Sequence, residues 1–520
     1  MDNYKLYIFL SFAFTFSLIF DFLKFSEQKT AIDIVNDMGI GYNLGNTFDC
    51  YDSKIKIENP DDQITLYKNP IPTQNLILRL KKYGFKTIRI PITWINFIDE
   101  KGNINSKWLY RIKEVVNWII NAQMYCIINT QDDGDLGNWL SEGLESKDIY
   151  INLWTQIANE FKDYDEHLIF ESMNQPQFYS HYFTYDYKTL LILSQAFVDT
   201  IRNSDNMNKQ RLLIISGASA ELELSTYEDF KLPVDPVNKT ALSLHYYNPH
   251  NFVFDPAPTD DISLYKDYLT WGNDNDYQEL FTDFNLIKSS FLDKNIPVII
   301  TATGVLTEEK KEKKSIREYL YTVFSLSNEY NGMMTCLWDS SKSKNNTNYY
   351  PNYNMNYYNR EKDIWFDKKI QNNFLQISKG KYMKMSEYYI KSNKEIFIEP
   401  NHDDDYLIKL GNRKPLKIIF NAKIKGQYFQ DSKVIFTCYN TSNLLNEFII
   451  EKKYLKKEYD GTSTFTFDIS DKNCFYDIRL YKYNGGNDNF IFNNLTVEFQ
   501  DSFLYFDYKS YKNDLENYIN

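Results

Sequence analysis

Residues able to hold or react with a polar ligand recur where short apolar segments of the sequence end. The set comprises an arginine, two carboxamides, an imidazole, a phenol and an indole: Arg89, Asn174, Gln175, His245, Tyr247 and Trp338. Carboxamides, imidazoles and phenols form hydrogen bonds with polar uncharged molecules, and flat aromatic rings offer a stacking surface. The set therefore suits a polar uncharged ligand, although a histidine such as His245, taken alone, is more often a satisfied core residue.

The elements that must position these residues follow a regular alternation between about residues 30 and 395. Short apolar segments, rich in Ile, Val, Leu, Tyr or Phe, lie at 40–46, 87–93, 125–130, 168–175, 212–217, 241–247, 297–304 and 335–340. Amphipathic stretches such as 74–83, 107–121, 147–163 and 188–202 separate them. Eight strands alternating with helices predict an α/β fold, the (β/α)₈ TIM barrel, whose active site lies at the carboxyl ends of the strands.

Five motifs at the predicted strand ends carry a resemblance to a known family. They are GYNLGNTFD at 41–49, FKTIRIPITW at 85–94, FESMNQP at 170–176, SLHYYNP at 243–249 and LWD at 337–339. In this order and spacing the series resembles glycoside hydrolase family 5, particularly its endo-β-1,4-glucanases. The resemblance extends from about residue 31 to residue 389.

The resemblance implies a chemistry that this chain departs from at two positions. Retaining glycosidases use two carboxyl groups about 5–5.5 Å apart, one as acid and base and one as nucleophile. The family pattern puts the acid at Gln175 and the nucleophile at Ala302. A carboxamide cannot donate a catalytic proton, and a methyl group has no lone pair. The histidines that the family carries after its third strand are also replaced, by NTQDD at 129–133.

The remaining family positions imply that sugar binding persists. By resemblance, Asn174 meets the sugar 2-hydroxyl and Trp338 stacks under a glucosyl ring. The resemblance also implies that the floor of the pocket is lined by Arg89, His245 and Tyr247. The Gln175 amide can still form a hydrogen bond with a glycosidic oxygen. A positioned general acid alone contributes roughly 10²–10⁴-fold to the rate. We therefore expect a catalytically degenerate endoglucanase-like protein that binds β-glucan or a related plant polysaccharide.

Two alternatives stay open. A residual or rewired glycosidase could use Asp132 or Asp133 as its catalytic carboxylate; otherwise these two residues form a solvated loop pair. Glu171 is a less suitable replacement, because it lies about 13 Å deeper than Gln175 along the same strand and is expected to be buried and paired. Alternatively, the chain could be a structural or adhesive surface protein. Among the tryptophans, Trp94, Trp139 and Trp271 are candidate sugar platforms, whereas Trp108, Trp118 and Trp154 are expected in the core.

Composition limits the partners. The chain has 520 residues and a formal net charge of −12, so it does not attract the phosphates of nucleic acids. The cysteines, five in number, form no dense disulfide framework or metal motif, so we expect no cofactor and no metal. Cys126 and Cys336 fall in strand patterns and should pack as small apolar residues, while Cys438 and Cys474 could pair. A monomer is expected.

The two ends of the chain suggest further segments. The apolar run at 6–20 behind Lys5 is too short for a comfortable membrane span, and residues 1–27 are expected to be a signal peptide or, if retained, an anchor. The protein is thus expected to be secreted, with the barrel at 28–395. Alternating runs at 416–420, 433–439, 447–451, 462–467, 475–483 and 490–498 predict an all-β sandwich at 396–510, which could bind carbohydrate.

Overall fold

The computed structural model describes residues 29–52, 54, 56–134, 138–179, 184–254, 269–307, 310–341, 354–392, 395–398, 405–411, 415–426, 433–440, 443–450, 459–468, 476–483, 489–500 and 502–519. The segment at 1–27, expected to be a signal peptide or anchor, lies outside the described residues. None of the helices in the described part is long and apolar enough to cross a membrane.

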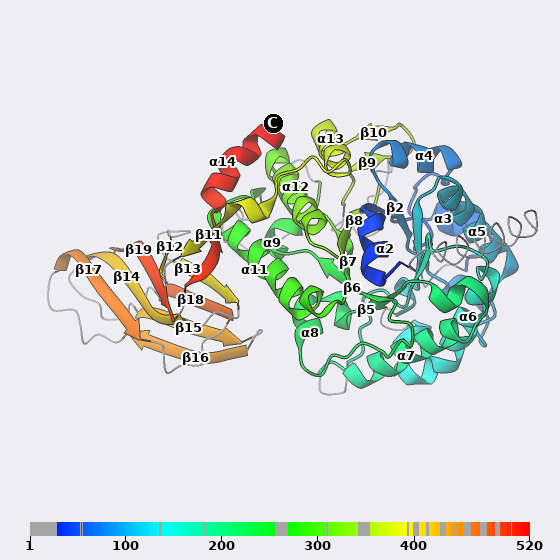
Figure 1. The fold of residues 1–520 in the computed structure, drawn as a ribbon, viewed down its shortest axis with the longest axis horizontal. Helices are drawn as coiled ribbons and strands as arrows, with labels where there is room; N and C mark the ends of the chain where they lie inside the picture. The colour runs from blue at the N-terminus through cyan, green and yellow to red at the C-terminus, as the bar shows by residue number, and fades with distance from the viewer. Residues whose placement is uncertain are drawn as a thin grey trace, which may run out of the picture.

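Eight parallel strands close into a barrel in their sequence order, because β1 pairs with both β2 and β8 (Figure 1). They are β1 (Ile40–Leu44), β2 (Thr87–Ile90), β3 (Tyr125–Ile128), β4 (Leu168–Glu171), β5 (Leu213–Ser216), β6 (Thr240–Tyr246), β7 (Val298–Thr303) and β8 (Met333–Asp339). The predicted (β/α)₈ barrel is confirmed. Most strands end before the predicted segments do, because the chain there leaves the ladder to form the loops of the active face.

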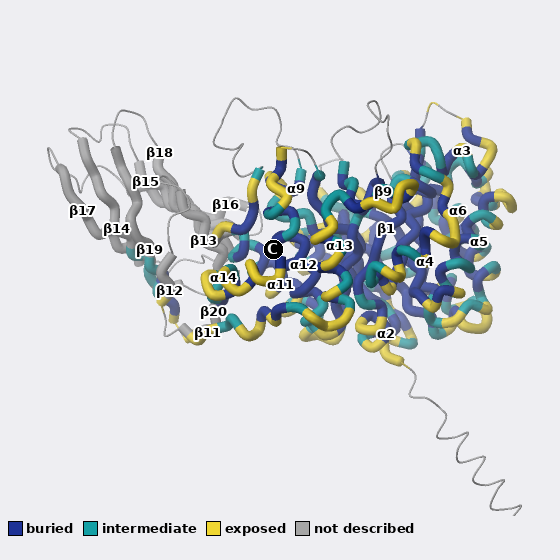
Figure 2. Tube along the Cα trace, turned by 90° about the horizontal axis from the view of Figure 1, so that it is seen from above, coloured by how far each residue is buried: buried dark blue, intermediate teal, exposed yellow. Residues whose placement is uncertain are grey.

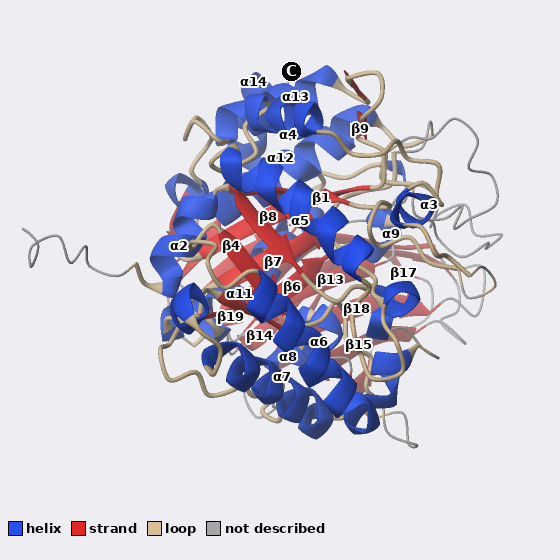
Figure 3. Ribbon diagram, turned by 90° about the vertical axis from the view of Figure 1, so that its right-hand side faces the viewer, coloured by secondary structure: helices blue, strands red, loops and turns tan. Residues whose placement is uncertain are grey.

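Helices surround the strands and bury their outer faces, as Figure 3 shows from the side. They are α3 (Pro60–Ile64), α4 (Gln74–Lys82), α5 (Ser106–Asn121), α6 (Lys147–Glu160), α7 (Tyr187–Arg202), α8 (Leu222–Thr226), α9 (His250–Val253), α11 (Asp274–Ser290), α12 (Lys313–Glu329) and α13 (Lys368–Ile377). Figure 2 shows that the buried part of the chain is concentrated inside this shell. Cys50, Cys126 and Cys336 are buried free thiols, which confirms the packing expected for the latter two.

The helix α2 (Ala31–Met38) closes the amino end of the barrel. Its buried side chains recur at helical spacing, at positions 31, 34, 35 and 38, and so form one apolar stripe. That stripe belongs to the same cluster as Ile127, Ile169 and Ile299, which lie inside the barrel. A capping box between Thr30 and Asp33 fixes the start of the helix. The opposite end of the barrel stays open for a site.

Beyond β8, short strands replace the alternating pattern. The pair β9 (Tyr358–Asn359) and β10 (Ile364–Trp365) precedes α13. Two four-stranded sheets follow, built from β12 (Glu395–Ile398), β13 (Asp405–Gly411), β14 (Pro415–Gly426), β15 (Lys433–Asn440), β16 (Asn443–Ile450), β17 (Tyr459–Asp468), β18 (Tyr476–Tyr483) and β19 (Asn489–Phe499), with antiparallel pairing. Face-to-face packing as a sandwich stays a prediction, as does the Cys438–Cys474 pairing, because Cys474 lies outside the described residues.

After these sheets the chain returns to the barrel, which the sequence analysis did not anticipate. Strand β11 (Tyr389–Ser392) pairs with β20 (Phe503–Phe506), and the chain ends in helix α14 (Tyr508–Ile519). Phe506 stacks on Phe281 of α11, and Tyr511, Leu515 and Ile519 are buried in the main core cluster. The sheets are thus inserted between two segments that both pack on the barrel.

Candidate functional site

A cleft of about 660 Å³ opens at the carboxyl ends of the barrel strands. Five of the residues expected in a site line this cleft. Asn174 and Gln175 follow β4, His245 and Tyr247 lie at the end of β6, and Trp338 lies on β8. Arg89 on β2 and Ala302 on β7 are fully buried and are not among the lining residues. Arg89 therefore lies beneath the cleft, not on its floor as expected.

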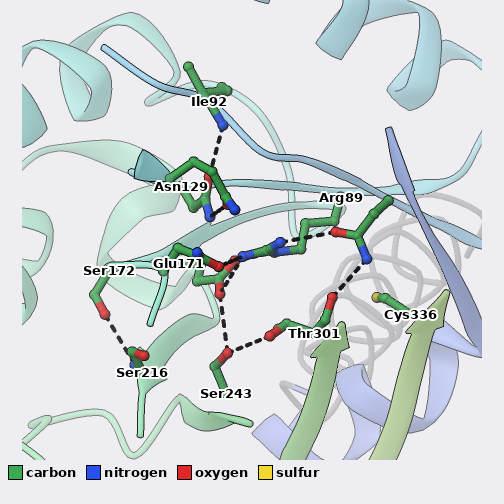
Figure 4. A network of polar contacts seen from close by, with 12 residues as sticks. Arg89, Ile92, Asn129, Glu171, Ser172, Ser216, Ser243, Thr301 and Cys336 are labelled. Carbon is green, nitrogen blue, oxygen red and sulfur yellow. Dashed lines mark hydrogen bonds and ion pairs between the residues drawn. The ribbon is translucent and has the colours of Figure 1, made fainter. Parts of the chain in front are cut away.

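Arg89 is the centre of a buried polar network (Figure 4). Its guanidinium donates from Nε and Nη2 to the two carboxylate oxygens of Glu171, at 2.6 and 3.0 Å, and both side chains are fully buried. The remaining donors reach Asn43 Oδ1 and Asn174 Oδ1, each at 3.0 Å. The expected buried pairing of Glu171 is present, and Arg89 fixes the carboxamide of Asn174 through a charge-assisted hydrogen bond.

The network continues to the strands on the far side of the barrel. Ser243 Oγ donates to Glu171 Oε1 at 3.1 Å and lies 2.6 Å from Thr301 Oγ1. Asn43 Nδ2 donates to the Thr301 carbonyl at 2.8 Å. Buried polar groups are tolerated when they are bonded to one another, and here the bonds join β1, β2, β4, β6 and β7. The network therefore fixes the backbone immediately before Ala302.

Gln175 is held in an unusual backbone conformation at the edge of the cleft. Its φ is +37°, in the left-handed region that non-glycine residues rarely occupy. Pro176 follows, and its carbonyl accepts a 2.7 Å hydrogen bond from the Tyr185 hydroxyl. The same hydroxyl accepts from the Ser219 amide at 3.3 Å. Such strain persists only where surrounding contacts enforce it, and it is concentrated at functional positions.

His245 is neutral. Part of its ring faces the cleft, but both ring nitrogens are buried without a hydrogen-bond partner among the described residues. Burial, with a smaller contribution from the positive charge of Arg89, holds the pKa of the imidazole well below its usual value. Its register partner on β7 is Ala302. The Tyr247 ring meets the His245 ring edge to face, with centroids 5.9 Å apart, and burial raises the pKa of its phenol.

Trp338 is positioned by a glycine and by a buried ion pair next to it. A Cβ atom on Gly45 would lie 3.1 Å from the indole Cζ2, so the ring lies directly against the glycine backbone. The neighbouring Asp339 is buried, which raises the pKa of its carboxyl group, and it pairs with Arg360 at 3.6 Å. Arg360 also donates to the Gly45 carbonyl at 2.9 Å. Sequence analysis missed Arg360.

The two neighbouring aspartates differ, contrary to the expectation of a solvated pair. Asp133 is fully buried, and its carboxylate accepts from the Trp94 amide at 3.1 and 3.0 Å and from Trp139 Nε1 at 2.8 Å. Asp132 is partly exposed and lines the cleft. Of the two, Asp132 alone can meet a ligand in the cleft.

The platform role expected for Trp94 and Trp271 is wrong in the described structure, whereas that of Trp139 stays a prediction. Trp94 is 0% exposed and donates from Nε1 to the Asn129 carbonyl, and Trp271 is 4% exposed. Trp139 is partly buried against the core and does not line the cleft. Their side chains turn inward from the loops because apolar rings gain more from burial than from solvent. Trp108 and Trp154 are fully buried, as expected, and Trp118 packs partly buried against the core.

Further acidic side chains line the cleft that sequence analysis did not identify. Glu221 and Glu223 lie in the segment after β5, and partial burial together with the charge of Glu223 raises the pKa of Glu221. Asp49 also lines the cleft, and burial raises the pKa of its carboxyl group. No group of three or more potential metal ligands occurs among the described residues.

Comparison with known sequences gives one family. A family model described as cellulase (glycosyl hydrolase family 5) matches residues 49–344. Endoglucanase A of Clostridium longisporum is 30% identical over 332 residues, covering 62% of this chain and 61% of that protein. Endoglucanase B of Neocallimastix patriciarum is 31% identical over 330 residues, covering 61% of this chain and 66% of that protein. The match spans less than two thirds of either relative.

Solved structures give the same result. A GH5-4 broad specificity endoglucanase from an uncultured bovine rumen ciliate is 48% identical, with a TM-score of 0.63, and the match covers 68% of this chain and 99% of that chain. A GH5-4 broad specificity endoglucanase from Ruminococcus champanellensis with bound cellotriose is 28% identical, with a TM-score of 0.59 and coverage of 67% and 99%.

Proposed function

Because this chain belongs to glycoside hydrolase family 5, we propose that it binds β-glucan in the barrel cleft without hydrolysing it. The observation that carries the proposal is the combination of residues at one site. Gln175 lines the cleft, and Ala302 is the register partner of His245, which also lines it. Gln175 therefore lies at the cleft and Ala302 lies buried behind His245, and neither of the two positions to which the family resemblance assigns a carboxyl group has one.

The groups that remain are suited to binding. The cleft combines a carboxamide pair, Asn174 and Gln175, with an imidazole whose pKa is held below its usual value and with an indole, all of which interact with an uncharged hydroxylated ligand. The site is also rigid, because Arg89 fixes Asn174 and the Gly45 backbone supports Trp338. A preorganised site loses less conformational entropy when a ligand binds.

Hydrolysis is tested by restoring the missing groups. Reducing-end release from barley β-glucan, carboxymethylcellulose and xyloglucan is measured for the wild type and for a Gln175→Glu, Ala302→Glu double variant. We expect a silent wild type and an active double variant. A Gln175→Glu, Ala302→Gln variant adds the same bulk without the second carboxylate and should remain silent. Turnover by the wild type at the rate of the double variant would contradict the proposal.

Binding is tested separately by electrophoresis in gels containing soluble β-glucan. The wild type should be retarded, and Trp338→Ala should weaken binding at the cleft, because truncation removes the stacking surface. Absence of retardation with every β-glucan tried would contradict binding, whatever the hydrolysis assay shows.

A second function, residual hydrolysis, is favoured by one observation: Asp132 lines the same cleft as Gln175. It could act as an acid or base in place of the missing groups. An Asp132→Asn variant that abolishes a measurable wild-type turnover would establish this alternative, whereas Asp133→Asn would affect folding first because Asp133 is buried.

Secretion is part of the proposal and is supported by the apolar run at residues 6–20. Mass spectrometry of the protein from its native source should show loss of a segment near residue 27, and an intact amino terminus would contradict a cleaved signal peptide.

A further inference from the structure

Helix α5 lies on the side of the barrel away from the C-terminal sheets (Figure 1). A second groove follows the outer surface of this helix. Its volume is about 660 Å³, similar to that of the cleft. Tyr110 is 72% exposed, the largest exposure among the exposed large aromatic side chains of the described residues, and Trp118 lies two turns further along the helix.

The charged side chains along this groove are compensated. Lys113 pairs with Glu160, and Glu114 pairs with Arg111, which also lies 3.4 Å from Asp61. Although the chain has a formal net charge of −12, the electrostatic potential along this groove is therefore neither strongly negative nor strongly positive. Such a surface suits an uncharged ligand and gives no attraction to nucleic acid or to an anionic membrane.

The uncharged groups are oriented for hydrogen bonding and stacking. The Tyr164 hydroxyl donates to Asn117 Oδ1 at 2.6 Å, which leaves the amide hydrogens of Asn117 Nδ2 as donors. The Arg111 guanidinium lies 5.7 Å from the centre of the Trp118 ring and fixes it by a cation–π contact. Gln74 and Asn121, both exposed, add further carboxamides.

We propose that this groove is a second β-glucan site, separate from the cleft. This second proposal depends on the proposed function in one respect only, which is that the bound glycan is taken to be β-glucan. Tyr110 and Trp118 provide aromatic surface for the sugar rings, and the carboxamides meet the hydroxyls. Helix α5 follows β2, so its first turn lies at the end of the barrel that carries the cleft. A polysaccharide can therefore contact both sites, and two weak sites on one protein raise the overall avidity.

The test uses the full chain with Tyr110→Ala, Trp118→Ala, Trp338→Ala and the Tyr110→Ala, Trp338→Ala pair, run in gels containing barley β-glucan. Tyr518→Ala, which truncates an exposed tyrosine on α14, is the matched control. Tyr110→Ala should weaken binding roughly tenfold, about 1.4 kcal/mol. Trp338→Ala should leave partial retardation, which the double variant removes. Circular dichroism shows whether each variant is folded.

The outcomes separate the two sites. If folded Tyr110→Ala and Trp118→Ala bind as the wild type does, the groove proposal is overturned and binding in the cleft is unaffected. If Trp338→Ala has no effect while Tyr110→Ala abolishes retardation, the groove is established and cleft binding fails. A concentration-dependent dimer in analytical ultracentrifugation that Tyr110→Ala dissociates would assign the groove to a second copy and overturn the glycan site.

Discussion

His245 and Ala302 are register partners on the adjacent strands β6 and β7, and the imidazole of His245 has no hydrogen-bond partner among the described residues. A carboxylate at position 302 would lie beside this ring and supply both an acceptor and a negative charge. The neighbouring Arg89 instead adds a positive charge that, after burial, lowers the pKa of the imidazole. An alanine at position 302 therefore leaves the His245 ring without the negative charge that a carboxylate there would supply.

The first prediction concerns pH. The pKa of His245 is lower in the folded protein than the value of about 6.5 of an unfolded chain, so below that pH the unfolded state binds more protons. The free energy of unfolding should therefore fall as the pH falls below about 6.5. His245→Asn removes this contribution, and urea unfolding between about pH 7.5 and 5 should show a smaller loss than the wild type. Equal losses in both proteins would contradict the shift.

The pair of Arg89 and Glu171 gives a second prediction. Neither side chain is exposed, and removing one partner leaves a buried charge that nothing neutralises. Glu171→Gln should lower the free energy of unfolding by about 3–5 kcal/mol, measured by urea denaturation. The exposed pair of Lys56 and Glu58 is the control, and Glu58→Gln should leave the urea midpoint close to that of the wild type, because solvent screens an exposed pair. Similar effects of the two changes would show that the buried network is dispensable.

Gly45 gives a third prediction, on binding. An alanine Cβ there would lie 3.0 Å from the Asp339 carbonyl oxygen and 3.1 Å from the Trp338 ring, so the indole must shift. Gly45→Ala should weaken β-glucan binding several-fold in the affinity gel while the chain stays folded. Gly134→Ala is the matched control, because no described residue lies within 4 Å of the Cβ that it would add, and it should leave binding unchanged. Wild-type affinity in Gly45→Ala would show that the ring position does not matter.

The sequence predicted the strands well because each is a short apolar run, and buried barrel strands differ from their flanks in composition. It also predicted that Glu171 is buried and paired, since its depth along β4 follows from strand geometry. These are properties of single segments. The family resemblance, by contrast, supplied the roles expected of Gln175 and Ala302, which geometry alone does not define.

The residues that prediction missed depend on contacts between distant segments. Arg360 bonds to Gly45 and Asp339, which come from opposite ends of the barrel sequence, and no local pattern marks it. Asp133 is buried because it accepts from the Trp94 amide and from Trp139, and loop sequences do not encode such pairings. Trp94 lies beyond the end of β2, where the alternation of side chains along a strand no longer predicts whether a side chain points inward or outward.

The last prediction concerns the terminal helix α14. Sequence analysis did not predict this helix, although the sequence contains a local helical pattern that marks it. Tyr511, Leu515 and Ile519 recur every four residues, as on one face of a helix, and all three are buried. Leu515→Ala should lower the free energy of unfolding by about 2–5 kcal/mol, because it removes buried methyl groups and leaves a cavity between α14 and the barrel. Asn517→Ala, on the exposed face of α14, should change it by no more than about 0.5 kcal/mol.

A barrel fragment ending at residue 392 lacks α14 and exposes the surface that the helix covers, so it should unfold at lower urea concentration than the full chain. Equal midpoints for the fragment and the full chain, measured by tryptophan fluorescence, would show that α14 adds nothing to the stability of the barrel.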